Sequence, residues 1–181
     1  MKKDVLFIHG AGQGAYEEDG KLVASLQQAL GTGYAIRYPK VEEENPELEV
    51  WQAQIEEELA AFDNGSILVG HSFGGSILLK YLSEHTLEKP VGGIYIIAAP
   101  YWGAEDWQYE AYALLENVAS KLPQESPIVL YHSRDDEIVP FSHLALYAEK
   151  LPQATVRAFE DRGHQLNNNL AEVAEDIKKG E

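Results

Sequence analysis

The sequence predicts an α/β fold in which a parallel β-sheet lies between two layers of helices, a three-layer α/β/α sandwich. Short apolar runs alternate with segments of helical period from one end to the other. Several runs are apolar throughout, as expected of parallel strands that are buried on both faces. The 181 residues suffice for one domain with a hydrophobic core and are few for two. We therefore expect a single domain over residues 1–181.

Six apolar runs are the candidate strands of this sheet. In chain order they span residues 5–8, 34–38, 66–69, 91–98, 128–132 and 155–159. The first run follows two lysines and so resembles the start of an export signal. Its apolar stretch is about four residues long, however, whereas a signal needs roughly 7–15. We interpret it as the first strand.

Five segments between or after these runs are the candidate helices, and they span residues 21–30, 46–62, 73–85, 142–150 and 169–179. We expect Asp19 to cap the first helix and Gly31 to end it. Asn45 and Pro46 have the residue types of a cap and a first helical position for the second. The segment 101–122 is longer and rich in aromatic residues, which predicts a partly helical, cap-like excursion above the carboxyl edge of the sheet.

Composition excludes several classes of function. The chain has no cysteine, which excludes disulfides, thiolate metal sites and a cysteine nucleophile. Its 14 basic and 30 acidic residues give a net charge of -16, which argues against nucleic acid or an anionic membrane as a partner. No apolar run approaches the roughly 20 residues that span a bilayer. We expect a cytoplasmic protein without a metal or cofactor, and its oligomeric state stays open.

A candidate nucleophile lies between the third strand and the third helix. Residues 70–74 read Gly-His-Ser-Phe-Gly, a Gly-x-Ser-x-Gly motif in its required context of strand, sharp turn and helix. Gly70 and Gly74 leave room where the strand and the helix come close. The helix that follows directs amides and its positive end at developing negative charge. We interpret Ser72 as the nucleophile, in preference to a passive serine in a glycine-rich turn.

The loop after the first strand is a candidate oxyanion hole. Residues 9–14 read His-Gly-Ala-Gly-Gln-Gly, and such glycines let a loop present free amides to a ligand. We expect the N–H groups of Ala11 and Phe73 to hold the oxyanion. A dinucleotide-phosphate loop is the competing interpretation, but the second strand ends in Arg-Tyr-Pro, without the acidic residue which that motif needs. His9 is interpreted as a structural brace rather than a base.

A serine hydroxyl needs a base near neutral pH, and the base needs a carboxylate to orient it. The candidate acids are Asp135, Asp136 and Glu137, directly after the fifth strand. An acid there lies at the carboxyl edge of the sheet, where open α/β sheets bind ligands. Asp136 is our first choice and Asp135 the second.

His164 is the candidate base. It follows the sixth strand, and Gly163 allows a bend that would turn it back over the sheet edge. The other histidines fit less well, because of where they lie in the predicted elements: His71 inside the nucleophile turn, His85 at the end of a helix, His132 in a strand before the acid and His143 at the start of a helix.

With Ser72, Asp136 and His164 in this chain order, the sequence resembles the α/β-hydrolase superfamily over nearly its whole length. Residues 136–140, Asp-Glu-Ile-Val-Pro, are similar to the acid turn of that superfamily, which favours Asp136 over Asp135. The compact chain looks most like the small YdeN-type and retinoblastoma-binding-protein-type serine hydrolases. The resemblance implies a minimal α/β-hydrolase fold with a six-stranded parallel sheet in the order 2-1-3-4-5-6, with a ligand bound beside residues 10–11 and Ser72.

The leading hypothesis is hydrolysis of a small carboxylic ester or related acyl compound through an acyl-enzyme. Candidate pocket residues are His9, His71, Tyr101, Trp102 and Trp107, although the aromatic ones could equally cover core. One alternative is a different reaction at the same triad, such as acyl transfer, thioester cleavage or C–C bond cleavage. Another is a non-catalytic interaction protein on a hydrolase scaffold.

Overall fold

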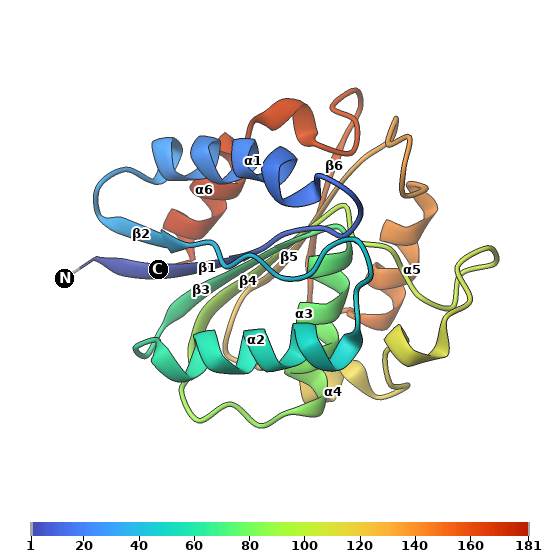
Figure 1. Ribbon diagram of the computed structural model, residues 1–181, viewed down its shortest axis with the longest axis horizontal. Coiled ribbons are helices and arrows are strands. Elements are labelled where there is room, and N and C mark those ends of the chain that lie inside the picture. Colours follow the sequence, from blue (N-terminus) through green and yellow to red (C-terminus); the bar gives the residue numbers. More distant parts are fainter. Residues whose placement is uncertain (1, 181) are drawn as a thin grey trace.

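The chain folds around a six-stranded sheet in the order β2-β1-β3-β4-β5-β6, in which every neighbouring pair is parallel (Figure 1). The structure, a computed structural model, describes residues 2–180. The predicted parallel sheet and its strand order are confirmed. The order reverses between β1 and β3, so the chain leaves these two strands for helices on opposite faces of the sheet, and open α/β sheets bind ligands at such a point.

All six predicted strands are present, with ends that differ from the expected ones by two residues at most. Their bounds are β1 Lys3–Ile8, β2 Tyr34–Arg37, β3 Ser66–His71, β4 Val91–Ile97, β5 Ile128–Ser133 and β6 Thr155–Phe159. In register, Val5 of β1 lies opposite Ile36 of β2 and Ile67 of β3.

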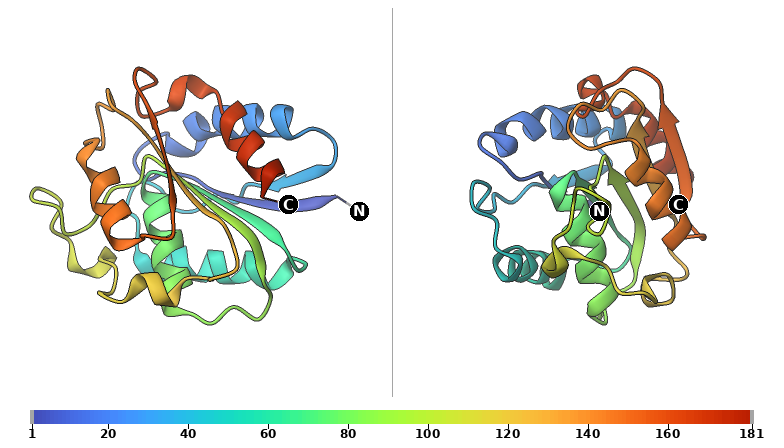
Figure 2. Two further views of the ribbon diagram at one scale, coloured as in Figure 1. Left: turned by 180° about the vertical axis from the view of Figure 1, so that it is seen from behind. Right: turned by 90° about the vertical axis from the view of Figure 1, so that its right-hand side faces the viewer.

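Helices cover both faces of the sheet, as predicted. Their bounds are α1 Ala15–Leu30, α2 Leu48–Ala61, α3 Phe73–Glu84, α4 Val118–Lys121, α5 Ser142–Lys150 and α6 Ala171–Lys179. Helices α1 and α6 lie on one face, and the other four lie on the opposite face (Figures 1 and 2). None of the helices within residues 2–180 is long and apolar enough to cross a bilayer.

The central strands contribute side chains to two separate hydrophobic cores, one on each face of the sheet. Val5 and Phe7 of β1 are buried with α1 and α6, whereas Leu6 and Ile8 are buried with α2 and α3. Successive side chains of a strand point to opposite faces, so a strand that is covered on both sides must be apolar at every position. Burial of such a side chain contributes about 1.5–3 kcal/mol.

The predicted start of α1 is wrong. The helix begins at Ala15 rather than residue 21, after Gly14 in a left-handed conformation with φ 79°. Asp19 is therefore inside the helix and does not cap it. Its side chain is buried, and its carboxylate accepts a hydrogen bond from the Gly10 amide and pairs with His71. These long-range partners outweigh the capping preference of an aspartate.

The predicted start of α2 is also wrong. The helix begins at Leu48, and Glu47 before it is extended with φ -105° and ψ 130°. Asn45 and Pro46 lie outside the helix. The carbonyl of Pro46 accepts a hydrogen bond of 3.1 Å from the Tyr112 hydroxyl, so a contact with the distant segment 101–122 accompanies the later start.

The segment 101–122 departs from the βα alternation, as predicted. It contains one turn of 3-10 helix, η1 at Glu110–Tyr112, and the short α4, and Figure 1 shows it beside α5. The indole nitrogen of Trp102 donates a hydrogen bond of 3.0 Å to the Ser76 hydroxyl on α3. This contact ties the segment to the helix that follows the nucleophile turn.

Candidate active site

The turn between β3 and α3 holds Ser72 in a strained conformation. Its φ is 52° and its ψ -128°, outside the regions that a non-glycine residue ordinarily adopts. Its amide donates a hydrogen bond of 2.8 Å to the carbonyl of Ile97 at the end of β4. Strain of this kind costs about 1–3 kcal/mol and persists only where the surroundings fix the backbone.

Two glycines make this turn possible. A Cβ atom on Gly74 would lie 2.1 Å from the carbonyl oxygen of His9, and one on Gly70 would lie 2.6 Å from the Cα of Gly75. Both approaches are to backbone, which cannot rotate away. The Gly-x-Ser-x-Gly pattern therefore reflects the close crossing of β1, β3 and α3 under Ser72.

We expect Gly74→Ala to destabilise the fold by about 3 kcal/mol or more, because the added methyl group collides with backbone. Gly20→Ala is the matched control: Gly20 lies within α1, and a Cβ atom there would meet nothing within 4 Å. Alanine there should stabilise the protein by roughly 0.5–1 kcal/mol. Urea unfolding of both variants measures the two effects, and equal stabilities would contradict this account of the turn.

Ser72, His164 and Asp136 form one chain of hydrogen bonds. The Ser72 Oγ lies 3.1 Å from Nε2 of His164, and Nδ1 of His164 lies 2.8 Å from Oδ2 of Asp136. Because a carboxylate only accepts, Nδ1 carries the proton and donates it to Asp136. Nε2 is then the free acceptor for the Ser72 hydroxyl. The structure thus brings the three predicted residues together in the arrangement of a general base with its orienting acid.

Asp136 is held ionised by four donors. Its Oδ1 accepts hydrogen bonds from the amides of Ile138 and Val139, both at 2.8 Å. Its Oδ2 also lies 3.1 Å from Nε2 of His132, which donates a further hydrogen bond of 2.9 Å to the Val139 carbonyl. Burial on its own would raise the pKa of Asp136, but the hydrogen bonds from His132, His164 and Val139 outweigh it and hold that pKa well below its usual range. Sequence reasoning assigned no such role to His132, since nothing in its position shows that it shares the carboxylate.

Asp135 has different partners. Its Oδ1 accepts hydrogen bonds from the Ser133 hydroxyl at 2.6 Å and from the Gly163 amide at 2.8 Å. The bond from Gly163 connects the loop after β5 to the loop after β6, one residue before His164. Asp135 therefore fixes the loop that carries the histidine, whereas Asp136 contacts its ring.

The loop that carries His164 has an unusual backbone. Gly163 has φ 60°, as the predicted tight bend requires. Leu166 also has a positive φ, 45°, and its side chain is fully buried with α1 and α6. The Arg162 amide donates a hydrogen bond of 2.8 Å to the Ser133 hydroxyl. A buried anchor on one side and a hydrogen bond on the other hold His164 over the sheet edge.

Two backbone amides are available for an oxyanion beside Ser72. Within residues 2–180, the N–H groups of Ala11 and Phe73 have no hydrogen-bond acceptor. The loop after β1 is close to Ser72, since a Cβ on Gly10 would lie 3.2 Å from the Cβ of Ser72. Phe73 is the first residue of α3, so the positive end of that helix faces the same space. The arrangement can stabilise negative charge on a ligand oxygen held beside Ser72.

Comparison with known families agrees with this geometry. Residues 16–170 match the family model described as Serine hydrolase. The chain belongs to the serine hydrolase family. A search of curated protein sequences found no match.

Solved structures share the fold of this serine hydrolase at low sequence identity. The esterase domain of a Rhodothermus marinus protein is 21% identical with a TM-score of 0.72, over 98% of this chain and 85% of that one. The ydeN gene product of B. subtilis is 20% identical with a TM-score of 0.73, over 99% and 98%. A meta-cleavage product hydrolase from Pseudomonas fluorescens IP01 is 17% identical with a TM-score of 0.75, over 99% and 92%. These similarities confirm the α/β-hydrolase fold and the resemblance to the YdeN type.

His9 lies behind the site of this serine hydrolase rather than in a pocket wall. It is fully buried, and its Nε2 accepts a hydrogen bond of 3.0 Å from the Val41 amide, while Nδ1 donates to the Gly10 carbonyl at 2.6 Å. One donor and one acceptor suit a neutral imidazole. Burial lowers the pKa of His9, which agrees with that state. His71, also named as a candidate pocket residue, is likewise buried at 1% exposure.

The neutral state of His9 predicts a pH dependence of stability. The pKa of His9 is lowered in the folded protein. At a pH below the ordinary histidine pKa of about 6.5, the unfolded chain therefore binds a proton at His9 that the folded protein does not bind. Stability should therefore fall as the pH drops below about 6.5. In His9→Gln this contribution is absent, so its unfolding free energy should vary less than that of the wild type between about pH 7 and pH 5. Parallel curves for the two proteins would contradict a neutral His9.

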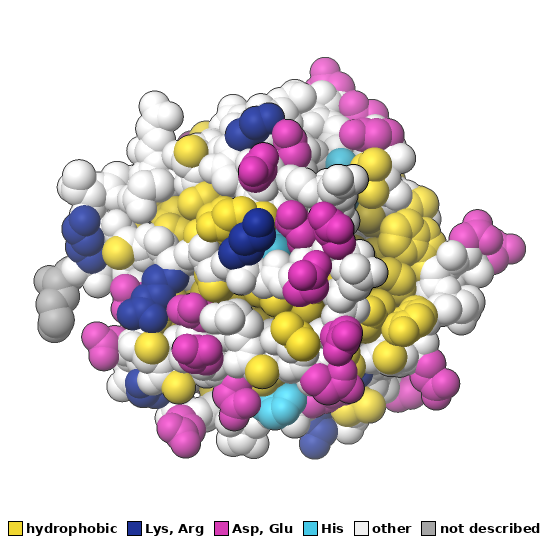
Figure 3. Space-filling view, in the orientation of Figure 1, with side chains coloured by type: hydrophobic (Ala, Val, Ile, Leu, Met, Phe, Trp, Pro, Cys, Tyr) yellow, Lys and Arg dark blue, Asp and Glu magenta, His cyan; other side chains and the backbone are white. Residues whose placement is uncertain are grey.

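An aromatic cluster borders the nucleophile turn. Trp102 is in ring contact with Phe73, Tyr112 and Trp107, at centroid distances of 6.2, 5.0 and 5.4 Å. The Tyr101 amide donates a hydrogen bond of 2.8 Å to the ring of His143. Tyr101, Trp102 and Tyr112 pack against the core and stay partly exposed. Hydrophobic side chains gather at the right of Figure 3, the side on which Figure 1 shows the segment 101–122.

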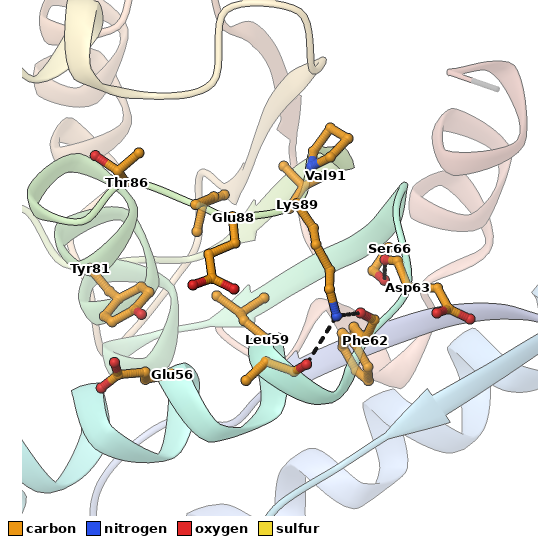
Figure 4. Close-up of a pocket in the computed structure, with 13 residues that line it drawn as sticks. Glu56, Leu59, Phe62, Asp63, Ser66, Tyr81, Thr86, Glu88, Lys89 and Val91 are labelled. Carbon is orange, nitrogen blue, oxygen red and sulfur yellow. Dashed lines mark hydrogen bonds between the residues drawn. The ribbon is translucent and has the colours of Figure 1, made fainter.

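A hollow lies at the edge of the sheet opposite Ser72. It is lined by the ends of α2 and α3 and by the starts of β3 and β4 (Figure 4). There Lys89 donates hydrogen bonds to the carbonyls of Ala60 and Phe62, so it satisfies the end of α2. The lining residues of this hollow do not include Ser72, Asp136 or His164. Within residues 2–180, no group of His, Cys, Asp and Glu side chains could hold a metal ion.

Proposed function

We propose that this serine hydrolase cleaves a small carboxylic ester or related acyl substrate through an acyl-enzyme at Ser72. The observation that carries the proposal is the unbroken hydrogen-bond chain from Asp136 through His164 to Ser72. A serine hydroxyl is a weak nucleophile unless a base takes its proton. His164 has the free Nε2 for this task, and Asp136 holds its ring in the required tautomer.

The reaction follows from these positions. Ser72 Oγ attacks the substrate carbonyl while His164 Nε2 takes the hydroxyl proton. The carbonyl oxygen becomes an oxyanion, which the amides of Ala11 and Phe73 hold. His164 then gives its proton to the departing alkoxide, and the acyl group stays on Ser72. Water, deprotonated by His164, releases the acid and restores the hydroxyl.

The side chains near Ser72 support a largely apolar acyl group. Trp102, whose ring contacts Phe73, and Trp107, whose ring contacts Trp102, are partly exposed. Ile138, two residues after Asp136, is 56% exposed. We propose that Tyr101, Trp102 and Trp107 border the acyl site. Acyl transfer, thioester cleavage and C–C bond cleavage would share the same first step. The cytoplasmic location expected from the sequence stays a prediction.

Hydrolysis of p-nitrophenyl acetate tests the proposal. We expect a burst of p-nitrophenol equal in amount to the enzyme, because acylation of Ser72 by an activated ester outpaces deacylation, followed by steady turnover. Thioester and p-nitrophenyl esters of increasing chain length, measured beside it, define the acyl site. If none of these substrates is turned over, the proposal is wrong, and an interaction protein on this scaffold becomes the better account.

A further inference from the structure

A second buried aspartate–histidine pair adjoins the proposed triad. Asp19 of α1 and His71, the last residue of β3, are each 1% exposed, and Nδ1 of His71 lies 2.8 Å from Oδ2 of Asp19. The ring of His71 lies against the ring of His164, with centroids 4.8 Å apart. The reaction described above uses neither Asp19 nor His71.

The pair contacts the oxyanion loop (residues 9–14) and the loop that carries His164, and its histidine adjoins the turn at Ser72. Asp19 Oδ2 also accepts a hydrogen bond of 2.8 Å from the Gly10 amide, in the oxyanion loop. Asp19 Oδ1 accepts one of 3.0 Å from the side chain of Gln165, next to the triad histidine. On the other side, Nε2 of His71 donates to the backbone carbonyl of His164 at 3.0 Å. His71 itself directly precedes the nucleophile.

The partners of His71 require it to be charged. A carboxylate oxygen and a carbonyl oxygen are both acceptors, so both ring nitrogens must donate, as they do only in an imidazolium. The titratable groups that act on its ring are Asp19, His164 and Asp136. Burial would lower the pKa of His71, but Asp19 outweighs it and raises that pKa; burial would raise the pKa of Asp19, but His71 and the Gly10 amide lower it. The two form a buried ion pair.

We propose that Asp19 and His71 are positioning residues, an ion pair that fixes the backbone of His164 and the oxyanion loop relative to Ser72. The inference rests on the proposed roles of Ser72 and His164. Charge-assisted hydrogen bonds are short and strong, so they suit a junction between three loops. A misplacement of about 1 Å at a catalytic centre can lower the rate about 10²-fold, and this is the scale of effect that loss of the pair should have.

Kinetics of Asp19→Asn, His71→Gln and the double variant provide the first test. Each single change leaves one buried charge without its partner, whereas the double variant leaves none, so it keeps the test open if a single variant does not fold. We expect kcat to fall about 10²-fold and KM to change less than about threefold, because positioning acts on the transition state. Asp176→Asn is the control: that carboxylate pairs with Arg157 and Tyr131, and its loss should leave kcat unchanged.

NMR of protein with ¹⁵N-labelled histidines provides a readout that does not need turnover. We expect both ring nitrogens of His71 to be protonated at about pH 8, above the ordinary histidine pKa of about 6.5. In the double variant, the Nδ1 proton of His164 should exchange faster with water, because the backbone of His164 is no longer fixed and its ring is less well aligned with Asp136. A neutral His71 at that pH, or a double variant with wild-type kcat, overturns the inference. If both ring nitrogens of His71 are protonated in a wild type that does not hydrolyse esters, the proposed function is contradicted and the ion pair is not.

Discussion

Ser72→Ala should lower kcat for ester hydrolysis by about 10³–10⁶-fold while the protein stays folded. Without the Oγ, no acyl-enzyme can form, and only the oxyanion amides and substrate binding stay to accelerate attack by water. The small change from serine to alanine leaves the strained backbone and the hydrogen bond of the Ser72 amide to Ile97 intact. Steady-state kinetics with p-nitrophenyl acetate, beside circular dichroism, measure both parts of the expectation.

Ser83→Ala is a suitable control, because Ser83 lies at the far end of the same helix and its hydroxyl donates to the carbonyl of Lys80. It should retain most of the activity. If Ser72→Ala hydrolyses the ester as fast as the wild type, another group carries the reaction and the assignment of the nucleophile is wrong.

Asp136→Asn should lower kcat by about 10⁴-fold, because an asparagine amide cannot hold His164 in the tautomer that leaves Nε2 free. The asparagine is close in size to the aspartate, so the surrounding backbone bonds have room to persist. The substitution should therefore lower kcat strongly and change the free energy of unfolding little. Kinetics and urea unfolding of the same preparation separate these two effects.

Asp135→Asn is the matched comparison, since the two acids are adjacent and differ only in their partners. Asp135 contacts Ser133 and Gly163 and not the ring of His164. We expect its loss to lower stability and to change kcat by less than about tenfold. Equal losses in kcat for Asp135→Asn and Asp136→Asn would contradict the assignment of Asp136 as the sole orienting acid.

Much of the fold was predictable because the central strands are buried on both faces. Val5 to Ile8 form an unbroken apolar run, and such runs indicate parallel strands without knowledge of their neighbours. The nucleophile turn was predictable for a related reason: Gly70 and Gly74 are needed wherever a strand and a helix cross this closely. In both cases the residues that cause the structure lie within the local sequence pattern itself.

The errors occurred where distant residues decide the structure. Asp19 has the residue type of a helix cap, and only its contact with His71, 52 positions away, explains its burial inside α1. Nε2 of His132 lies 3.1 Å from Oδ2 of Asp136, and no local sequence pattern indicates this contact. The preference for Asp136 over Asp135 came from a resemblance to known proteins. The different hydrogen-bond partners of the two acids appear only in the three-dimensional structure.

The central claim is that Ser72 is a nucleophile activated by His164, and a fluorophosphonate probe tests it most directly. Such probes phosphonylate an activated serine and stay attached, so intact mass and peptide mapping identify the reacting residue. The account predicts one adduct per chain, located at Ser72, and none in Ser72→Ala or His164→Ala. An unlabelled wild type, or an adduct on a different residue, would contradict it.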